Sequence, residues 1–278
     1  MFLRKPTSCP QWVQHLKSIQ IPVLRSTRDA VEAARENPDR VDANSLADLV
    51  LRDPLMTLRV LIHVSQKMGS RLATPVETVT AGLVLTGIEP FFRDFTELPV
   101  LEERLAEEPL ALESALQSFE RSHRAARLAA AFAIHRMDED AEVLHQAALL
   151  DNFVSLLLYC EAPSLMLEMA KRMRANPTLR SAEAQRSSLG TELAQLEQTL
   201  MAVWRLPPFL RRMTNVQNRE PGPQSVMLAV RIARHSQDRW SNPALPDDYV
   251  ELGKLLNLPP AGARALVLQV EGQPQTAA

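Results

Sequence analysis

The sequence predicts an all-α protein, and three observations carry that prediction. Leu, Ala, Glu, Gln and Arg, which are good helix formers, dominate the 278 residues. Only 8 residues are glycine, whereas 20 are proline, and most prolines stand between segments of helical periodicity, where they begin or end helices. No convincing run of strands interrupts this pattern.

The first half of the chain is predicted to form short helices separated by proline. The expected helices are Gln11 to Ile19, one from Ser26 or Thr27 to Asn37-Pro38, one opened by Asn44 or Ser45, one beginning at Asp53-Pro54, and one from Thr74-Pro75 to Gly87. Asp53-Pro54 is a strong start signal, because aspartate caps a helix and a proline at the first helical position loses no hydrogen bond.

An acidic segment, Leu98 to Glu113, connects the two halves of the chain. It holds five glutamates and few basic residues. An acidic docking surface and a solvated connector both fit this composition, and the connector is the favoured interpretation.

The second half is expected to hold longer helices and one linker. The helices are predicted at Pro109 to Met137, Val143 to Tyr159, Pro163 to Ala175 and Ser181 to Trp204, with a short one after Pro208 and three more at Ser225 to Gln237, Asp247 to Leu256 and Ala261 to Val270. Glu220-Pro221-Gly222-Pro223 has the composition of a linker.

The most apolar segment runs from Ala147 to Tyr159. A helix that is apolar on most sides belongs in a protein core, so this segment is predicted to be the central helix, with Trp204 packed nearby. Its uninterrupted apolar part falls far short of the roughly 20 residues that cross a bilayer.

Composition narrows the classes of function. The net charge of -2 argues against a broad, non-specific nucleic-acid binder. Two cysteines, no signal-peptide pattern and no expected membrane span favour a cytoplasmic chain. The six histidines form no liganding motif, and no phosphate-binding loop, dinucleotide fingerprint or nucleophile elbow occurs.

The order of several motifs resembles the HDOD domain, a degenerate relative of the HD-type metal-dependent phosphohydrolases of bacterial signalling. The blocks that carry the resemblance are Ile21-Pro22, Leu46 to Leu61, Pro75 to Gly87, Arg121-Ser122, Ala147 to Leu150 and Trp204-Arg205-Leu206-Pro207. The resemblance implies an HD-like orthogonal bundle of helices with extra C-terminal helices. The expected organisation is an N-terminal segment over residues 1–13, an HDOD-like domain over 14–218, a helical extension over 219–270 and a disordered tail over 271–278.

The departures from the HD pattern concern the metal ligands. The resemblance places non-histidine residues at the ligand positions, namely Asp151-Asn152 at the His-Asp pair, Arg121 at an earlier histidine, Leu193 at a later one and Gln217-Asn218 at the closing pair. A single carboxylate does not replace a cluster of imidazoles and carboxylates around a metal. The resemblance thus implies no metal, no cofactor and no catalytic residue.

In place of a metal centre we expect a polar network of Arg121, Asp151, Asn152, Gln217 and Asn218. Arg121 could pair with Asp151 within it. The alternative for Asp151 is a lone relic ligand.

The sequence is compatible with three candidate functions. The leading one is a non-catalytic signalling or scaffold protein that binds a protein partner, for which the resemblance implies a histidine kinase or a component of a cyclic-dinucleotide pathway. The second is a phosphohydrolase with a reduced ligand set. The third, less favoured, is a nucleic-acid-binding regulator, which would use the basic residues Lys171, Arg172, Arg174, Arg180, Arg205, Arg211 and Arg212.

Overall fold

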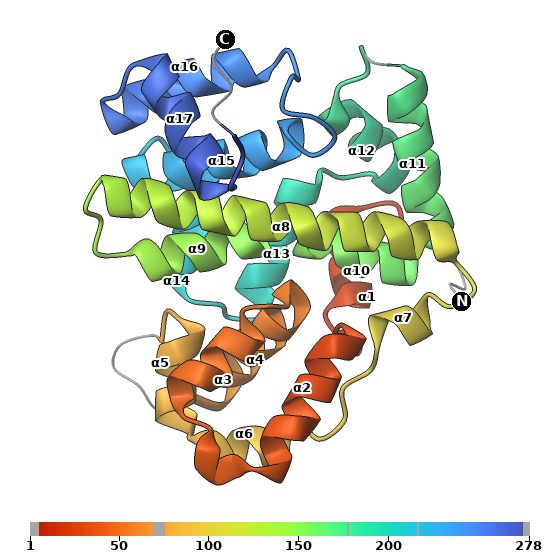
Figure 1. Ribbon diagram of the computed structural model, residues 1–278. Coiled ribbons are helices and arrows are strands. Elements are labelled where there is room, and N and C mark those ends of the chain that lie inside the picture. Colours follow the sequence, from red (N-terminus) through yellow and green to blue (C-terminus); the bar gives the residue numbers. More distant parts are fainter. Residues whose placement is uncertain (1–5, 69–75, 177, 216, 275–278) are drawn as a thin grey trace. The chain divides into compact units, whose positions relative to one another are not determined.

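The computed structural model describes residues 6–68, 76–176, 178–215 and 217–274, and it confirms the all-α class (Figure 1). Within these ranges the β structure amounts to one isolated parallel bridge between Val23 and Val100. The predicted start at Thr74-Pro75 lies outside the described residues. The helix that follows it begins at Val79, with the Thr78 hydroxyl accepting a hydrogen bond from the Ala81 N–H at 3.2 Å.

The chain divides into two compact units that are discontinuous in sequence. The first unit is Met1–Ser118 with Asn152–Pro207, and the second is Phe119–Asp151 with Pro208–Ala278. The consecutive boundaries expected at residues 13, 218 and 270 remain a prediction of the sequence.

Helix α8 (Pro109–His135) contributes residues to both units. The other helices of the first unit are α1 (Cys9–Leu16), α2 (Arg25–Glu36), η1 (Pro38–Arg40), α3 (Ala43–Val50), α4 (Pro54–Met68), α5 (Val79–Thr86), α6 (Ile88–Asp94), α7 (Leu101–Arg104), α10 (Phe153–Glu161), α11 (Pro163–Ala175), α12 (Ser181–Leu189) and α13 (Leu193–Val203). Those of the second unit are α9 (Ala141–Leu150), α14 (Pro208–Met213), α15 (Pro221–His235), α16 (Leu245–Leu256) and α17 (Pro260–Val270).

The predicted cap at Asp53 is confirmed. One carboxylate oxygen accepts the N–H groups of Leu55 at 2.8 Å and Met56 at 3.1 Å, in the first turn of α4. The other oxygen accepts the N–H of Leu24 at 2.7 Å. Asp53 is fully buried, so one carboxylate both starts α4 and ties it to the residue that precedes α2.

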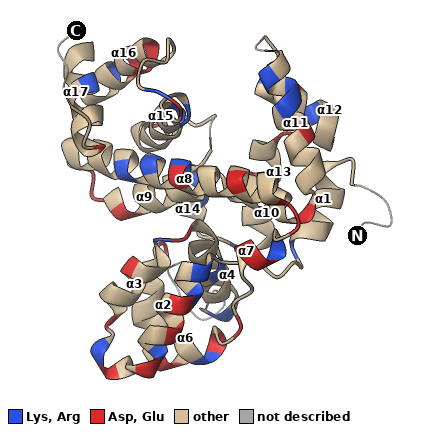
Figure 2. Ribbon diagram, turned by 45° about the vertical axis from the view of Figure 1, so that its right-hand side comes forward, with Lys and Arg blue, Asp and Glu red and all other residues tan. Residues whose placement is uncertain are grey.

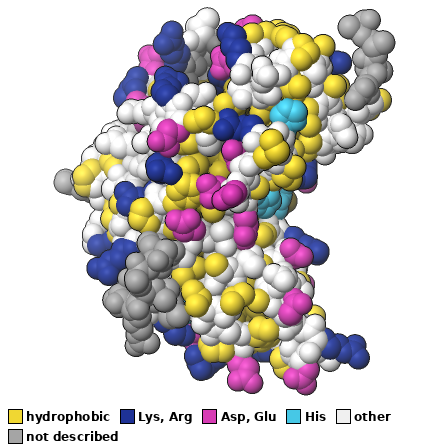
Figure 3. All heavy atoms as spheres, turned by 90° about the vertical axis from the view of Figure 1, so that its left-hand side faces the viewer, with side chains coloured by type: hydrophobic (Ala, Val, Ile, Leu, Met, Phe, Trp, Pro, Cys, Tyr) yellow, Lys and Arg dark blue, Asp and Glu magenta, His cyan; other side chains and the backbone are white. Residues whose placement is uncertain are grey.

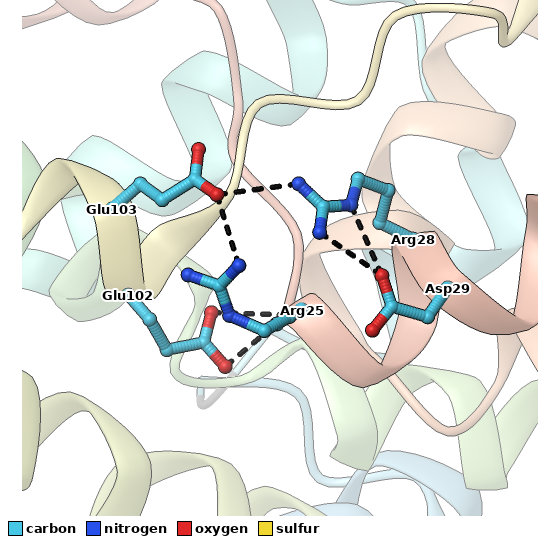
Figure 4. Close-up of polar contacts among 5 residues, drawn as sticks. All are labelled: Arg25, Arg28, Asp29, Glu102 and Glu103. Atoms are coloured by element: carbon cyan, nitrogen blue, oxygen red, sulfur yellow. Dashed lines mark hydrogen bonds and ion pairs between the residues drawn. The ribbon is translucent and has the colours of Figure 1, made fainter.

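The acidic connector is used inside the first unit. The Glu102 carboxylate accepts the backbone N–H of Arg25 at 2.9 Å, and Glu103 accepts from the guanidinium groups of Arg25 at 3.0 Å and Arg28 at 3.2 Å (Figure 4). These side chains are solvated, so the pairs position α7 beside the start of α2 at little gain in stability.

The predicted central helix is two helices, which corrects the sequence analysis. Helix α9 ends at Leu150, a turn covers Asp151 and Asn152, and α10 begins at Phe153. Asp and Asn side chains compete with the backbone for hydrogen bonds and disfavour a helix interior. The combined stretch Ala141–Glu161 has the length and composition of a membrane span, yet 78% of its most apolar window is buried in the structure, as in the core helix of a soluble protein.

The predicted packing of Trp204 is confirmed. The ring centroids of Phe153 and Trp204 lie 5.8 Å apart, and the indole N–H of Trp204 donates to the carbonyl of Lys17 at 3.4 Å. Helix α10 packs against α4, α11 and α13, which places it at the centre of the first unit.

The predicted helix from Ser181 to Trp204 is also broken, at Gly190. Gly190 has φ of 72° and ψ of 10°, a left-handed conformation that ends α12. The indole N–H of Trp12 donates to the carbonyl of Leu189 at 3.0 Å, and the chain at Thr7 passes so close to Gly190 that a Cβ would collide with its carbonyl. Contact with the N-terminal segment therefore accompanies the break, and the periodicity of the sequence does not reveal it.

The expected linker at Glu220 to Pro223 is instead the start of α15. Pro221 occupies the first helical position, where proline is tolerated. A Cβ on Gly222 would lie 2.9 Å from the Met213 sulfur, so the glycine permits close packing of α15 on α14 within the second unit.

We expect Leu156→Ala to lower the free energy of unfolding by about 2–5 kcal/mol, because Leu156 is fully buried in α10. Urea denaturation followed by circular dichroism measures the loss. The matched control is Leu110→Ala, since Leu110 is 65% exposed and should change stability by less than about 0.5 kcal/mol. Equal effects of the two substitutions would place α10 at the surface.

We expect Gly190→Ala to destabilise the protein more than Gly272→Ala does. Both glycines have positive φ, but a Cβ at position 272 meets nothing within 4 Å, whereas at position 190 it collides with Thr7. The control variant, Gly272→Ala, should therefore lose about 1 kcal/mol through backbone strain alone. The further loss of stability in Gly190→Ala measures the clash. A difference near zero would show that the N-terminal segment does not pack on Gly190.

Candidate functional site

Four of the five predicted network residues fall in the second unit. Arg121 lies on α8, Asp151 follows α9, and Gln217 and Asn218 stand in the loop between α14 and α15. Asn152 follows Asp151 in the turn but is grouped with the first unit.

Asp151 carries the least favourable charge in this set. Burial raises the pKa of its carboxyl to about 6, and the positive charges of Arg234 and then Arg121 offset part of that rise. The structure gives the carboxylate no hydrogen bond or ion pair to another described residue. A partly desolvated carboxyl with no direct donor favours its neutral form.

The direct Arg121–Asp151 pair that the sequence suggests is not among the ion pairs of the described chain. Arg121 instead donates to the side-chain oxygen of Gln237 at 2.8 Å. Arg121 and Asp151 thus interact through charge at a distance, which is weaker than a hydrogen-bonded ion pair.

Gln217 and Asn218 make their observed bonds within their own loop. The N–H of Gln217 donates to the Asn215 side chain at 3.0 Å. The Asn218 side-chain oxygen accepts the N–H of Glu220 at 2.9 Å, and its amide group donates to the Glu220 carboxylate at 3.4 Å. These bonds shape the entry to α15, and whether the five residues form one network remains a prediction.

Sequence reasoning missed the contribution of α15 to this site. Arg234 exerts the largest attractive charge on Asp151, and Gln237, two residues past the end of α15, holds Arg121. Neither residue stands at a motif position. The packing of α15 on α9 brings Arg234 near Asp151, and no local sequence pattern encodes that contact.

The side chains around Asp151 are a poor fit for a divalent cation. No group of three or more His, Cys, Asp or Glu side chains close enough to hold a metal ion occurs in the described ranges. Asp151 lies in the field of two guanidinium charges. A cation at this place would meet repulsion from Arg121 and Arg234.

The basic residues considered for nucleic-acid binding are divided between the two units. Lys171, Arg172 and Arg174 are exposed on α11, and Arg180 precedes α12. Figure 2 shows basic residues of the ribbon in blue. Arg211 and Arg212 lie on α14 in the second unit, where Arg212 covers the Phe209 ring at 4.7 Å. Arg172 donates to the hydroxyls of two serines of α12 at 3.3 Å, and the solvated helix face remains the favoured interpretation of the first group.

Comparison with known proteins places the chain in one family. The HDOD domain matches residues 21–220. None of the curated protein sequences matches the chain.

Two solved structures share the fold. The response regulator MmoQ from Methylococcus capsulatus is 20% identical, with a TM-score of 0.67 over 89% of this chain and 98% of that one. A virulence factor from Campylobacter jejuni is 14% identical, with a TM-score of 0.63 over 96% of both chains. At these identities the likeness establishes the fold alone.

Asp151→Asn should stabilise the protein at neutral pH. The folded-state pKa of about 6 lies above the ordinary 3.8, so the folded state holds this proton more tightly than the unfolded chain does. The resulting stabilisation is complete below the ordinary pKa and is lost as the pH rises through about 6. The variant should therefore exceed wild type by up to about 3 kcal/mol near pH 7 and by little near pH 4.

Urea denaturation at both pH values measures this difference. Asp247→Asn, at an exposed aspartate in the first turn of α16, is the control and should lack the pH-dependent gain. A loss of stability in Asp151→Asn at neutral pH would instead support a favourable ion pair at Asp151.

Proposed function

We propose that this chain, which belongs to the HDOD domain family, is a non-catalytic bacterial signalling or scaffold protein that acts in the cytoplasm by binding a protein partner. The observation that carries the proposal is the charge pattern at Asp151. The Asp151 carboxylate lies in the field of Arg234 and Arg121, and the resemblance aligns Asp151 with the His-Asp pair that holds metal in an HD-type enzyme.

The charges at this place support a structural rather than a catalytic role. Two guanidinium groups supply the positive charge that a divalent ion would otherwise bring, and a guanidinium neither exchanges ligands nor ionises a bound water. Because one fold can carry many functions, we assign the function of this chain to residues at its surface.

Exposed apolar side chains offer a surface for such contact. In the first unit, neighbouring residues Val84 and Leu85 on α5 are 65% and 48% exposed. On the face shown in Figure 3, hydrophobic side chains reach the surface between acidic and basic ones, and such mixed surfaces are typical of protein interfaces. The resemblance suggests a histidine kinase or a component of a cyclic-dinucleotide pathway as the partner.

The alternative function, a phosphohydrolase with a reduced ligand set, makes the opposite prediction about metal. If the proposal holds, purified protein should contain no stoichiometric metal, a chelator should leave Tm unchanged, and Mn²⁺ should not promote hydrolysis of bis(p-nitrophenyl) phosphate. Metal analysis, thermal melts and the hydrolysis assay provide the measurements. Bound metal together with hydrolysis that disappears in Asp151→Asn would establish the enzyme instead.

The same purified protein is used to test the proposed contact with a protein partner. Once an affinity-captured partner is identified, Val84→Asp with Leu85→Asp should abolish its direct binding in a purified pair. Ile134→Asp is the matched control, because Ile134 is 68% exposed and lies in the second unit. Equal binding by all three proteins would remove α5 as the contact surface.

A further inference from the structure

A cavity of about 400 Å³ lies within the second unit and has no part in the site described above. It is bounded by the loop that follows α15, by α16 and by the first turn of α17. Its volume falls in the range of small-molecule sites, which are mostly apolar with a few placed polar groups.

The walls of the cavity are aromatic and aliphatic. Trp240, Leu245, Tyr249 and Val250 line it, Ser241 and Asn242 add polar groups, and Val250 is 39% exposed. The guanidinium of Arg124 lies 5.3 Å from the centre of the Trp240 ring. This cation–π contact fixes the indole from outside the cavity lining, so the wall is formed before any ligand arrives.

Arg264 is the positively charged residue that lines the cavity. No hydrogen bond or ion pair from its guanidinium to another described residue is present. Its positive charge opposes the burial that raises the pKa of Tyr249, which indicates that the guanidinium lies near the phenol. Ala261, one turn before Arg264 in α17, also lines the cavity.

Asp248, the acidic residue beside this site, already has partners on α15. The Asp248 carboxylate lies 2.6 Å from Arg231 Nε and 2.6 Å from His235 Nδ1, and Asp248 is buried. Arg231 also contacts Glu251 at 2.5 Å. The positive charge of Arg264 is thus left for a group that enters the cavity.

We propose that this cavity binds a small amphipathic carboxylate, with an aromatic or branched aliphatic body against Trp240, Leu245 and Val250 and its carboxylate on Arg264. A carboxylate matches a single guanidinium in charge and in planar geometry. A phosphate monoester carries about two charges near neutral pH and would leave one of them unmatched in an apolar cavity. This inference does not depend on the proposed function.

The test uses the full chain with 3-phenylpropionate as probe and 3-phenylpropionamide as its uncharged analogue. Trp240 lines the cavity, while the other two tryptophans, Trp12 and Trp204, are buried in the first unit, so tryptophan fluorescence reports occupancy and Trp240→Phe should remove the signal. Titration calorimetry supplies an independent affinity. The carboxylate should bind saturably and at least about tenfold more tightly than the amide.

Two substitutions at position 264 separate charge from folding. Arg264→Gln should weaken binding of 3-phenylpropionate at least about tenfold, and Arg264→Lys should retain part of it, because the charge remains while the planar fork is lost. Arg239→Gln, at an exposed arginine outside the lining, should bind as wild type does. Circular dichroism and Tm show that each variant is folded.

The inference would be overturned by the absence of saturable binding, by equal affinity for the carboxylate and the amide, or by unchanged affinity in folded Arg264→Gln. Tighter binding of phenyl phosphate than of 3-phenylpropionate would likewise refute the inference, because it would show that the cavity prefers a doubly charged ligand to a carboxylate.

Discussion

Burial of the apolar stretch from Ala147 to Tyr159 is the constraint on which the rest of this structure depends. Apolar surface of that extent must leave water, and the chain removes it in two separate cores. Helix α9 packs against α14 and α15 in the second unit, while α10 packs against α4, α11 and α13 in the first. The turn at Asp151 and Asn152 joins the two cores, which explains why the most polar residues of the stretch stand at its middle.

Two aspartates show how differently a carboxylate can be enclosed. Asp53 is surrounded by donors, with the N–H groups of Leu24, Leu55 and Met56 on its oxygens, so its charge organises α2 and α4. Asp151 is stabilised only by the more distant charges of Arg234 and Arg121, and burial raises its pKa to about 6. Burial also raises the pKa of the Asp53 carboxyl, but its hydrogen-bond donors offset part of that cost, and Asp151 has no such donors among the described residues.

Helix α15 organises the polar side of the second unit. Arg231 pairs with Asp248 on α16, and His235 Nδ1 lies 2.6 Å from the same carboxylate. Arg234 lowers the electrostatic cost at Asp151, and the Ser236 carbonyl, just after the helix, accepts from Arg124 at 2.9 Å. Arg124 in turn pairs with Glu271 at 3.0 Å and covers Trp240. The residue expected to begin a disordered tail, Glu271, is thus held by an ion pair.

Elements whose signals are local could be predicted from the sequence. The all-α class, the cap at Asp53 and the bounds of Pro163–Ala175 follow from propensity, capping and proline, because these effects act within a few residues. The family resemblance also drew attention to Asp151, whose place in a polar network remains a prediction.

Contacts between distant segments set the remaining features of the fold. Approach of Thr7 to Gly190 accompanies the break that divides the predicted Ser181–Trp204 helix. Packing of α15 on α9 brings Arg234 toward Asp151, and α16 with α17 brings Tyr249 and Arg264 to one cavity. Such neighbours are set by how helices pack, and the spacing of residues along one helix carries no information about which other helix will cover it.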